Sequence, residues 1–170
     1  MRANHFDVIV IGAGPGGATA AFELAKAGVK TLLIEKQKLP RHKTCGGGLT
    51  YKVTKALSFD ISSVVERTIT SFVLTYKMSH PQVIKSPNPL VYIVGRSEFD
   101  NLLTNTAVNM GAQLMDETKV ANILTDDHCT VFTSRGTSTA DFLIGADGAT
   151  GITARPRLNG RSSSPPSRRK

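Results

Sequence analysis

A glycine-rich turn that joins a strand-like run to a helix-forming segment constrains the fold of this chain more than any other feature. Residues 6–11 are Phe-Asp-Val-Ile-Val-Ile, and residues 12–17 are Gly-Ala-Gly-Pro-Gly-Gly. A short, β-branched apolar run is typical of a strand buried inside a parallel sheet. Residues 18–27 favour a helix that ends at Gly28, and residues 31–35 form a second apolar run. The opening segment therefore predicts a β-α-β unit, which belongs to the α/β class.

Each glycine of the turn has a physical role in binding a phosphate. Gly12 allows the tight turn out of the strand, Gly14 leaves room for a pyrophosphate, and Gly17 lets the helix pack close to the strand. Pro15 and Gly16 lie in the same turn just before the helix, whose exposed N-terminal amides and dipole favour negative charge. These five residues are candidates for binding a dinucleotide. The alternative is a glycine cluster that merely turns a tight corner.

Glu35 ends the second apolar run, 18 residues after Gly17. A carboxylate at this place can accept hydrogen bonds from a ribose diol, and it disfavours a 2′-phosphate. The expected dinucleotide is therefore FAD or NAD rather than NADP, with Lys36 as a neighbouring candidate contact. The alternative is that Glu35 is a solvated strand end.

The remaining chain contains several strands and one longer helix. A basic loop covers residues 36–49, and residues 49–57 favour a short helix. Ser97 and Asp100 have the spacing of a capping box, which predicts a helix that ends at Gly111. The last three strands have hairpin-like spacing, so we expect a Rossmann-like parallel sheet extended by a β-meander. Strands are expected at residues 71–77, 91–94, 112–115, 120–124, 130–133 and 139–144, with a proline-rich connection between the first two.

Composition and charge exclude several classes of protein. The chain has 170 residues, 40% of them hydrophobic and 20% charged, which is ordinary for one globular domain. The net charge is +8, but the acid-free residues 155–170 carry +6 of it, and the first 154 residues hold 15 basic and 13 acidic side chains. A nucleic-acid partner is therefore not expected. Residues 156–170 are rich in Arg, Ser and Pro, which predicts a disordered basic tail.

Sequence signals for metal binding and location are sparse. Cys45 and Cys129 are too few for a disulfide framework and too widely spaced for a metal-ligand pair, so no metal site is expected. A reducing, cytoplasmic environment is the default for such a chain. No run approaches the roughly 18 apolar residues of a membrane-spanning helix. The N-terminus lacks the pattern of a signal peptide.

Three segments together resemble the FAD-binding fold of the p-hydroxybenzoate hydroxylase type. They are the turn at residues 12–17, Arg96 within residues 94–100, and the run Gly-Ala-Asp-Gly at residues 145–148. The segment Lys-Thr-Cys-Gly-Gly-Gly-Leu at residues 43–49 narrows the resemblance to the geranylgeranyl reductase branch. Members of that branch reduce isoprenoid double bonds in chlorophyll or archaeal-type lipid precursors. The resemblance extends from residue 5 to about residue 155.

The resemblance implies further cofactor contacts. Asp147 would bind the flavin ribitol and the Gly148 amide would face a phosphate, whereas the alternative is a common Asp-Gly turn. Arg96 would reach the pyrophosphate or ribose region, where a guanidinium fork suits phosphate oxygens, and the alternative is a surface arginine near a helix cap. Val120 lies on the strand that passes the adenine in this fold, and the alternative is a core residue.

The resemblance also places Cys45 near the isoalloxazine and the substrate, which makes it the candidate catalytic residue. Arg41 and Lys43 add positive charge nearby, which is expected to lower the pKa of the thiol. The alternative is a flexible glycine loop with an incidental cysteine. Bare amides that could stabilise a reduced flavin come from the three glycines that follow, Gly46, Gly47 and Gly48.

The resemblance implies an FAD-dependent oxidoreductase that reduces isoprenoid (geranylgeranyl) double bonds, with NADPH as the electron donor. The resemblance divides the chain into an FAD-binding domain at residues 1–155 and the tail at residues 156–170. Part of a β-rich substrate domain is inserted in the first of these at about residues 58–95. The family's second flavin motif and later substrate-domain strands are missing. We therefore expect a truncated or frame-shifted product that lacks the C-terminal half of the fold.

Two other functions share these motifs. A flavin-dependent monooxygenase has the same FAD-binding segments, although the loop that contains Cys45 argues against it. A non-catalytic FAD-binding fragment would bind the dinucleotide without turnover. For the reductase, a polyprenyl substrate implies contact with a membrane surface, so peripheral membrane association follows from the resemblance.

Overall fold

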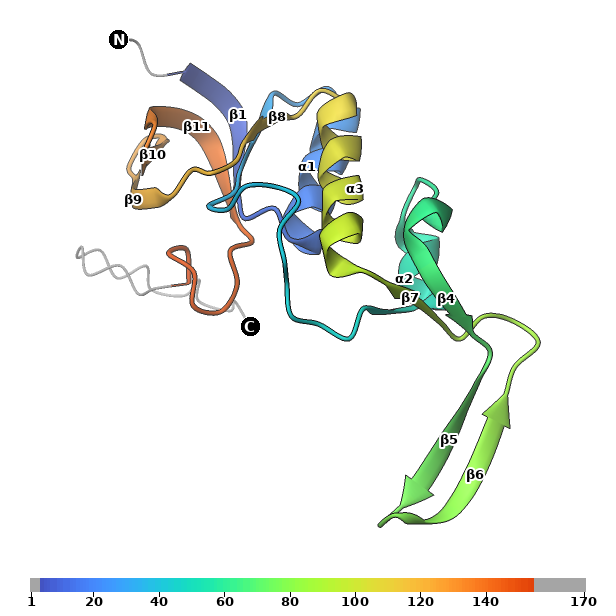
Figure 1. Cartoon of the computed structure of the whole chain (residues 1–170). Coiled ribbons are helices and arrows are strands. Elements are labelled where there is room, and N and C mark those ends of the chain that lie inside the picture. The colour runs from blue at the N-terminus through green and yellow to red at the C-terminus, as the bar shows by residue number, and fades with distance from the viewer. Residues whose placement is uncertain (1–3, 155–170) are drawn as a thin grey trace, which may run out of the picture.

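A six-stranded sheet forms the centre of the computed structural model, which describes residues 4–154 (Figure 1). Its strands, in spatial order, are β8 (Gln113–Met115), β2 (Thr31–Ile34), β1 (Asn4–Ile11), β11 (Gly136–Gly145), β10 (Cys129–Thr133) and β9 (Val120–Thr125). The first four run parallel, and β11, β10 and β9 are antiparallel neighbours. The predicted α/β fold, a parallel sheet with a β-meander, is confirmed. The tail expected at residues 156–170 lies outside the described residues.

Two helices, α1 (Pro15–Lys26) and α3 (Arg96–Asn109), lie side by side on one face of this sheet (Figure 1). Val8 and Val10 of β1 belong to the buried core on this face, together with Leu33 of β2. They share this core with residues of both helices, among them Ala18, Ala21, Phe22, Phe99, Leu103 and Ala107. This core fixes α1 directly after the C-terminal end of β1.

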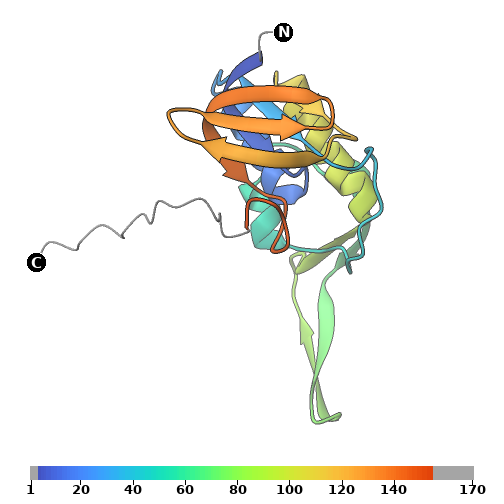
Figure 2. The same ribbon diagram turned by 90° about the vertical axis from the view of Figure 1, so that its left-hand side faces the viewer.

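The meander covers the other face of the sheet. Figure 2 shows β9, β10 and β11 lying across β1. A second buried core is formed there by Phe6, Ile9, Ile11, Leu32, Ile34, Ile123, Val131 and Ala140. Because β1 is buried from both sides, the run from Val8 to Ile11 is continuously apolar rather than alternating.

Residues 48–94 form two smaller sheets outside the central one. β3 (Gly48–Thr50), β7 (Val91–Val94) and β4 (Val65–Ile69) make an antiparallel sheet, with the short α2 (Tyr51–Ala56) and a 3-10 turn at Ser62–Val64 between β3 and β4. β5 (Ser71–Tyr76) and β6 (Ser79–Lys85) form a hairpin that projects from the body (Figure 1). The assignment of residues 58–95 to a substrate domain stays a prediction.

The hairpin corrects one sequence prediction. The segment between β5 and β7 was expected to be a proline-rich connection, but it contains all of β6. Pro81 fits this strand because each strand of a two-stranded hairpin has a free edge, where a missing N–H breaks no ladder bond. Both strands are exposed along their whole length, and Met78 at the tip is 94% exposed.

Both longer helices begin earlier than predicted. α1 begins at Pro15, whose fixed φ suits the first helical position, and Gly14 is its N-cap. α3 begins at Arg96 with Gly95 as its N-cap, so the predicted capping box of Ser97 and Asp100 is wrong. The Asp100 carboxylate instead accepts two hydrogen bonds from Arg96, which draws it away from the backbone amides of the helix start.

Close packing at the start of α1 gives a test of the fold. A Cβ atom on Gly17 would overlap the carbonyl oxygen of Gly12. We expect Gly17→Ala to lower the free energy of unfolding by about 1–3 kcal/mol, because the backbone must shift to relieve the overlap. Gly16→Ala is the matched control, since a Cβ there meets nothing within 4 Å and alanine favours a helix. Urea denaturation measures both changes, and equal midpoints for the two variants would contradict this account.

Candidate functional site

The glycine-rich turn brings the ends of β1, β2 and β11 together. Gly12 has a φ of +102°, which favours glycine, and a Cβ there would lie 2.5 Å from the carbonyl oxygen of Ala146. The Gly12 N–H donates to the Ile34 carbonyl at 2.7 Å, and the Ala146 N–H donates to the Ile11 carbonyl at 2.8 Å. The three strands therefore end at one edge, where α1 begins.

Gly14 is an open position of this turn that faces the cavity. It is the N-cap of α1, and the first turn of that helix contains no acidic residue. Among the described residues, a Cβ on Gly14 would come within 4 Å of Arg41 Nη2 alone, at 3.8 Å. The space beside Gly14 leads to the helix N-terminus, where backbone N–H groups and the helix dipole favour an anion.

Glu35 lies beside the turn and is almost fully buried, with 4% of its surface exposed. Its Oε2 accepts a hydrogen bond from the Ala13 N–H at 2.9 Å, and its Oε1 accepts one from the Gln37 N–H at 3.1 Å. The alternative of a solvated strand end is therefore wrong. A carboxylate offers about four lone pairs, so Glu35 keeps acceptor capacity beyond these two bonds.

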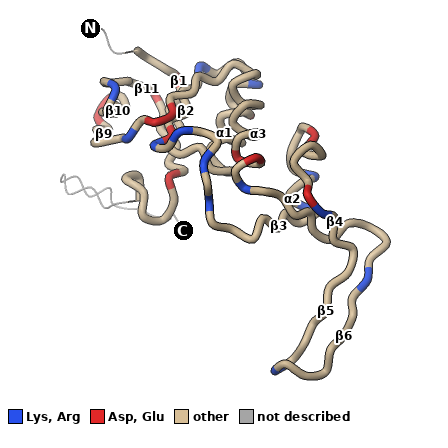
Figure 3. The backbone as a smooth tube through the Cα atoms, viewed as in Figure 1, with Lys and Arg blue, Asp and Glu red and all other residues tan. Residues whose placement is uncertain are grey.

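A cavity of about 820 Å³ opens between the turn, the segment after β2 and the start of β9. Its size is within the range of small-molecule and cofactor sites, roughly 300–1,000 Å³. Figure 3 shows Lys and Arg recurring along the loop that connects β2 to β3. Five basic side chains line the cavity, together with two acidic ones, Glu35 and Asp147. Nine of the residues predicted to bind the cofactor line it, namely Gly12, Gly14, Pro15, Glu35, Lys36, Arg96, Val120, Asp147 and Gly148.

The other predicted residues lie outside this lining. Gly16 lines a second hollow along the end of β11, and Gly17 is buried under the turn. Cys45, Gly46 and Gly47 belong to the loop that leads into β3, and Gly48 is the first residue of that strand. Gly47 has a φ of +67°, and its carbonyl accepts the Val94 N–H at 3.0 Å. This loop is therefore held against β7 by its backbone.

The Cys45 thiol is exposed, and its pKa lies below its usual value. The hydrogen bond from the Gly47 N–H has the largest effect, and a hydrogen bond from the Arg96 side chain comes next. The expected direction of the pKa shift is thus confirmed, but the cation responsible is Arg96 rather than Arg41 or Lys43. The Gly47 amide is also not bare, because it faces the thiol.

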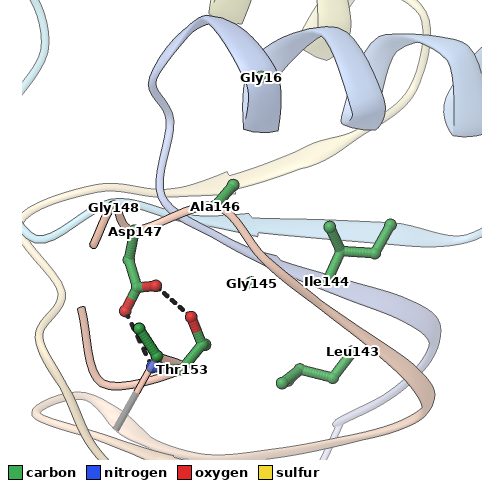
Figure 4. Close-up of a pocket in the computed structure, with 9 residues that line it drawn as sticks. Gly16, Leu143, Ile144, Gly145, Ala146, Asp147, Gly148 and Thr153 are labelled. Atoms are coloured by element: carbon green, nitrogen blue, oxygen red, sulfur yellow. Dashed lines mark hydrogen bonds between the residues drawn. The ribbon is translucent and has the colours of Figure 1, made fainter. Parts of the chain in front are cut away.

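Asp147 follows β11, and its carboxylate is contacted by the segment that comes just after it in the chain. Its carboxylate accepts hydrogen bonds from the Thr153 N–H, at 3.2 Å, and from the Thr153 hydroxyl (Figure 4). Gly151 passes so close that a Cβ there would overlap the carboxylate. A ligand hydroxyl that approaches Asp147 must therefore compete with Thr153.

Arg41 and Asp100 were not among the predicted site residues. Arg41 lines the cavity, and Asp100 is fully buried behind it in α3. The available signal for Asp100 was its four-residue spacing from Arg96, which suits an ion pair on one face of a helix. Arg41 stood out in the sequence by its charge alone, because its contacts come from segments distant in the chain.

Two further observations on residues 4–154 concern other kinds of site. No group of three or more His, Cys, Asp or Glu side chains in this range is placed to hold a metal ion. No helix in the same range combines the length and the hydropathy needed to cross a bilayer.

Comparisons with known proteins agree with this geometry. A sequence family described as FAD binding domain matches residues 5–161. An uncharacterised protein of Methanosarcina barkeri is 39% identical over 153 residues, which cover 89% of this chain and 40% of that protein. A digeranylgeranylglycerophospholipid reductase of Methanosphaera stadtmanae is 29% identical over 91% of this chain and 42% of its own length. The chain thus spans about 40% of the length of these relatives.

A solved structure shares the fold. The crystal structure of a geranylgeranyl bacteriochlorophyll reductase-like protein from Thermoplasma acidophilum matches with a TM-score of 0.76 and 26% sequence identity. The match covers 86% of this chain and 40% of that one. Because most of the chain is included, the similarity is not confined to the β-α-β unit.

The thiol environment gives a test of the Cys45 loop. In a Cys129→Ser background, we expect the pH midpoint of Cys45 alkylation by iodoacetamide to lie below that of the same chain unfolded in urea, because Gly47 and Arg96 favour the thiolate. Arg96→Gln should raise the midpoint, whereas Lys43→Gln, the matched control on the same loop, should leave it in place. A midpoint that follows Lys43 instead would show that the assignment of the cation is wrong.

Proposed function

Because the chain belongs to the FAD-binding domain family, we propose that it binds FAD in the cavity beside the glycine-rich turn. We propose further that it is the FAD-binding part of an oxidoreductase that reduces isoprenoid double bonds with electrons from NADPH. One observation carries the cofactor proposal: the open face of Gly14 lies at the N-terminus of α1, with the Glu35 carboxylate buried beside it.

The residues around the cavity fit a dinucleotide. A diphosphate suits the space at Gly14, because the helix N-terminus offers N–H donors and Arg41 faces the same space. The remaining lone pairs of Glu35 suit a ribose diol, and an acid at this position disfavours a 2′-phosphate. Val120 lines the same cavity at the start of β9, where backbone groups could meet the adenine.

The flavin end of the cofactor is assigned to Asp147 and to the segment around Arg96. Bound flavin supplies hydride-transfer chemistry, and the protein supplies its position and its electrostatic surroundings. Arg96 lines the cavity and also helps to lower the pKa of the Cys45 thiol, so it links the Cys45 loop to the cofactor site. Cys45, exposed beside Arg96, is the residue that we propose contacts the substrate.

The substrate class rests on similarity to named proteins and on one loop. The chain resembles a reductase of digeranylgeranylglycerophospholipids and a geranylgeranyl reductase-like structure. The Cys-Gly-Gly-Gly run of that loop supports the same branch. The test is anaerobic: loss of flavin absorbance on adding NADPH, and its return with a geranylgeranyl phospholipid that becomes saturated, would support a reductase. FAD binding without these changes would instead leave a binding fragment.

Gly14→Val tests where the phosphates bind. Valine suits the backbone at this position, with φ −74° and ψ 177°, and its side chain would occupy the space that we assign to the diphosphate. We expect FAD affinity to fall at least about 10-fold, which corresponds to about 1.4 kcal/mol, while the melting temperature stays unchanged. Quenching of flavin fluorescence measures the affinity. Equal FAD binding by the variant would exclude this turn as the phosphate site, and a wild-type chain that binds no FAD would overturn the cofactor proposal.

Thr153→Val tests whether Asp147 faces the cofactor. Removing the Thr153 hydroxyl frees one oxygen of the Asp147 carboxylate for a ligand hydroxyl. A net hydrogen bond is worth about 0.5–1.5 kcal/mol, so we expect FAD affinity to rise by about 2- to 10-fold. Thr150→Val is the matched control, because Thr150 belongs to the same segment and lines the cavity but has no hydrogen bond to Asp147 among those found in residues 4–154. Isothermal titration checks both, and an unchanged affinity in Thr153→Val would place the ribitol elsewhere.

A further inference from the structure

A buried carboxylate holds two guanidinium groups in the wall of the cavity. Asp100 is 0% exposed, and its Oδ1 and Oδ2 accept hydrogen bonds from Arg96 Nε at 2.8 Å and Arg96 Nη2 at 3.1 Å. Its Oδ2 also lies 3.4 Å from Arg41 Nη2. Asp100 itself does not line the cavity, whereas both arginines do. One residue of α3 therefore sets the position of two cations that face the space beside the turn.

Arg41 is held between two acids but is not fully bonded by them. Its Nε lies 3.7 Å from Glu35 Oε1, which is an ion pair but too long for a hydrogen bond. The Arg41 side chain is 10% exposed, and no group among residues 4–154 accepts a hydrogen bond from its buried Nε. A buried donor without an acceptor is costly. The arrangement is therefore that of a guanidinium prepared for an additional acceptor.

The place of Arg41 indicates which acceptor it fits. Its Nη2 is 3.8 Å from the position of a Cβ on Gly14, so it borders the open space at the N-terminus of α1. An anion in that space would meet the helix amides on one side and the guanidinium on the other. Guanidinium groups bind phosphate oxygens through two parallel N–H donors. A diphosphate, which carries several oxygens, can use both sets of donors together.

We propose that Arg41 binds the diphosphate of the dinucleotide and that Asp100 is the positioning residue that holds Arg41 for it, with Arg96 fixed beside it. This inference rests on the proposed function, because it deepens the same site. Asp100 acts through the two arginines and touches no ligand. Without the charge of Asp100, the one carboxylate left beside Arg41 among the described residues is that of Glu35, at 3.7 Å. The guanidinium is then free to leave the wall of the cavity.

The test compares ligands with and without the diphosphate on the full chain. Affinities for FAD, ADP-ribose and adenosine are measured by isothermal titration, with competition for weak ligands. For Arg41→Gln we expect FAD and ADP-ribose to bind about 10- to 100-fold more weakly, as for the loss of a charge-assisted hydrogen bond. Adenosine affinity should stay within about 2-fold, so the ratio of ADP-ribose to adenosine affinity falls. Lys38→Gln, an exposed residue of the same loop that does not line the cavity, is the matched control and should change neither ligand.

Asp100→Asn tests the positioning role. We expect the ADP-ribose to adenosine ratio to fall about 3- to 10-fold, and the double variant Asp100→Asn/Arg41→Gln to fall no further than Arg41→Gln alone, because both substitutions act on one guanidinium. A loss of stability alone would lower the affinities for ADP-ribose and adenosine together and leave the ratio unchanged, which would overturn the role of Asp100. Should Asp100→Asn fail to fold, Arg41→Lys is measured in its place. Lysine keeps the charge but lacks the planar fork, so the ratio of ADP-ribose to adenosine affinity should lie between those of the wild type and Arg41→Gln.

The outcomes separate this inference from the cofactor proposal. A wild-type chain that binds FAD and ADP-ribose, with Arg41→Gln binding them equally well, overturns the inference and leaves the FAD proposal in place. A wild-type chain that binds neither ligand overturns both. Selective loss of ADP-ribose and FAD affinity in Arg41→Gln, with adenosine retained, supports the assignment of the diphosphate to Arg41.

Discussion

The rest of the structure depends on the close packing of α1 against the end of β1. Gly17 rests on the Gly12 carbonyl with no room for a Cβ, and Gly12 in turn packs on the backbone of Ala146. These two contacts hold three distant segments at one edge of the sheet. They also orient α1 so that Gly14 faces open space. The small residues that permit close packing therefore also expose the helix N-terminus, and the candidate site follows from the packing.

Local patterns predicted the parts of the fold whose partners are close in the chain. The unit β1-α1-β2 is encoded by an apolar run, a glycine turn and a helix-forming run, and the meander β9–β11 by three runs at hairpin spacing. β4 and β6 were missed because neither is a continuous apolar run. β4 contains Glu66 and Arg67, and β6 contains Pro81. Their strand conformation is decided by pairing with β7 and β5, which periodicity along a single segment does not reveal.

The same limit applies to the site. Sequence indicated the turn and Glu35, because a glycine spacing and a strand end are local features. It did not indicate that Arg41 meets Asp100, since only the packing of α3 beside α1 brings the loop after β2 against that helix. The pKa of Cys45 is a second example. A generally basic loop was enough to predict that the pKa is lowered, yet the cation that lowers it, Arg96, comes from the start of α3.

Two acids and two cations form a connected group in the wall of the cavity, with Asp100 behind it, and their burial explains why the site depends on α3. Glu35 and Asp100 are buried and offset the charges of Arg41 and Arg96, so neither guanidinium needs solvent to balance it. Asp100 lies between Phe99 and Leu103, which fasten α3 into the core shared with α1. A small shift of this helix would move both cations relative to the turn, although no residue beside Gly14 had changed. The electrostatics of the turn are therefore set by a helix that does not belong to the β-α-β unit, and the glycine pattern alone is an incomplete description of the nucleotide site.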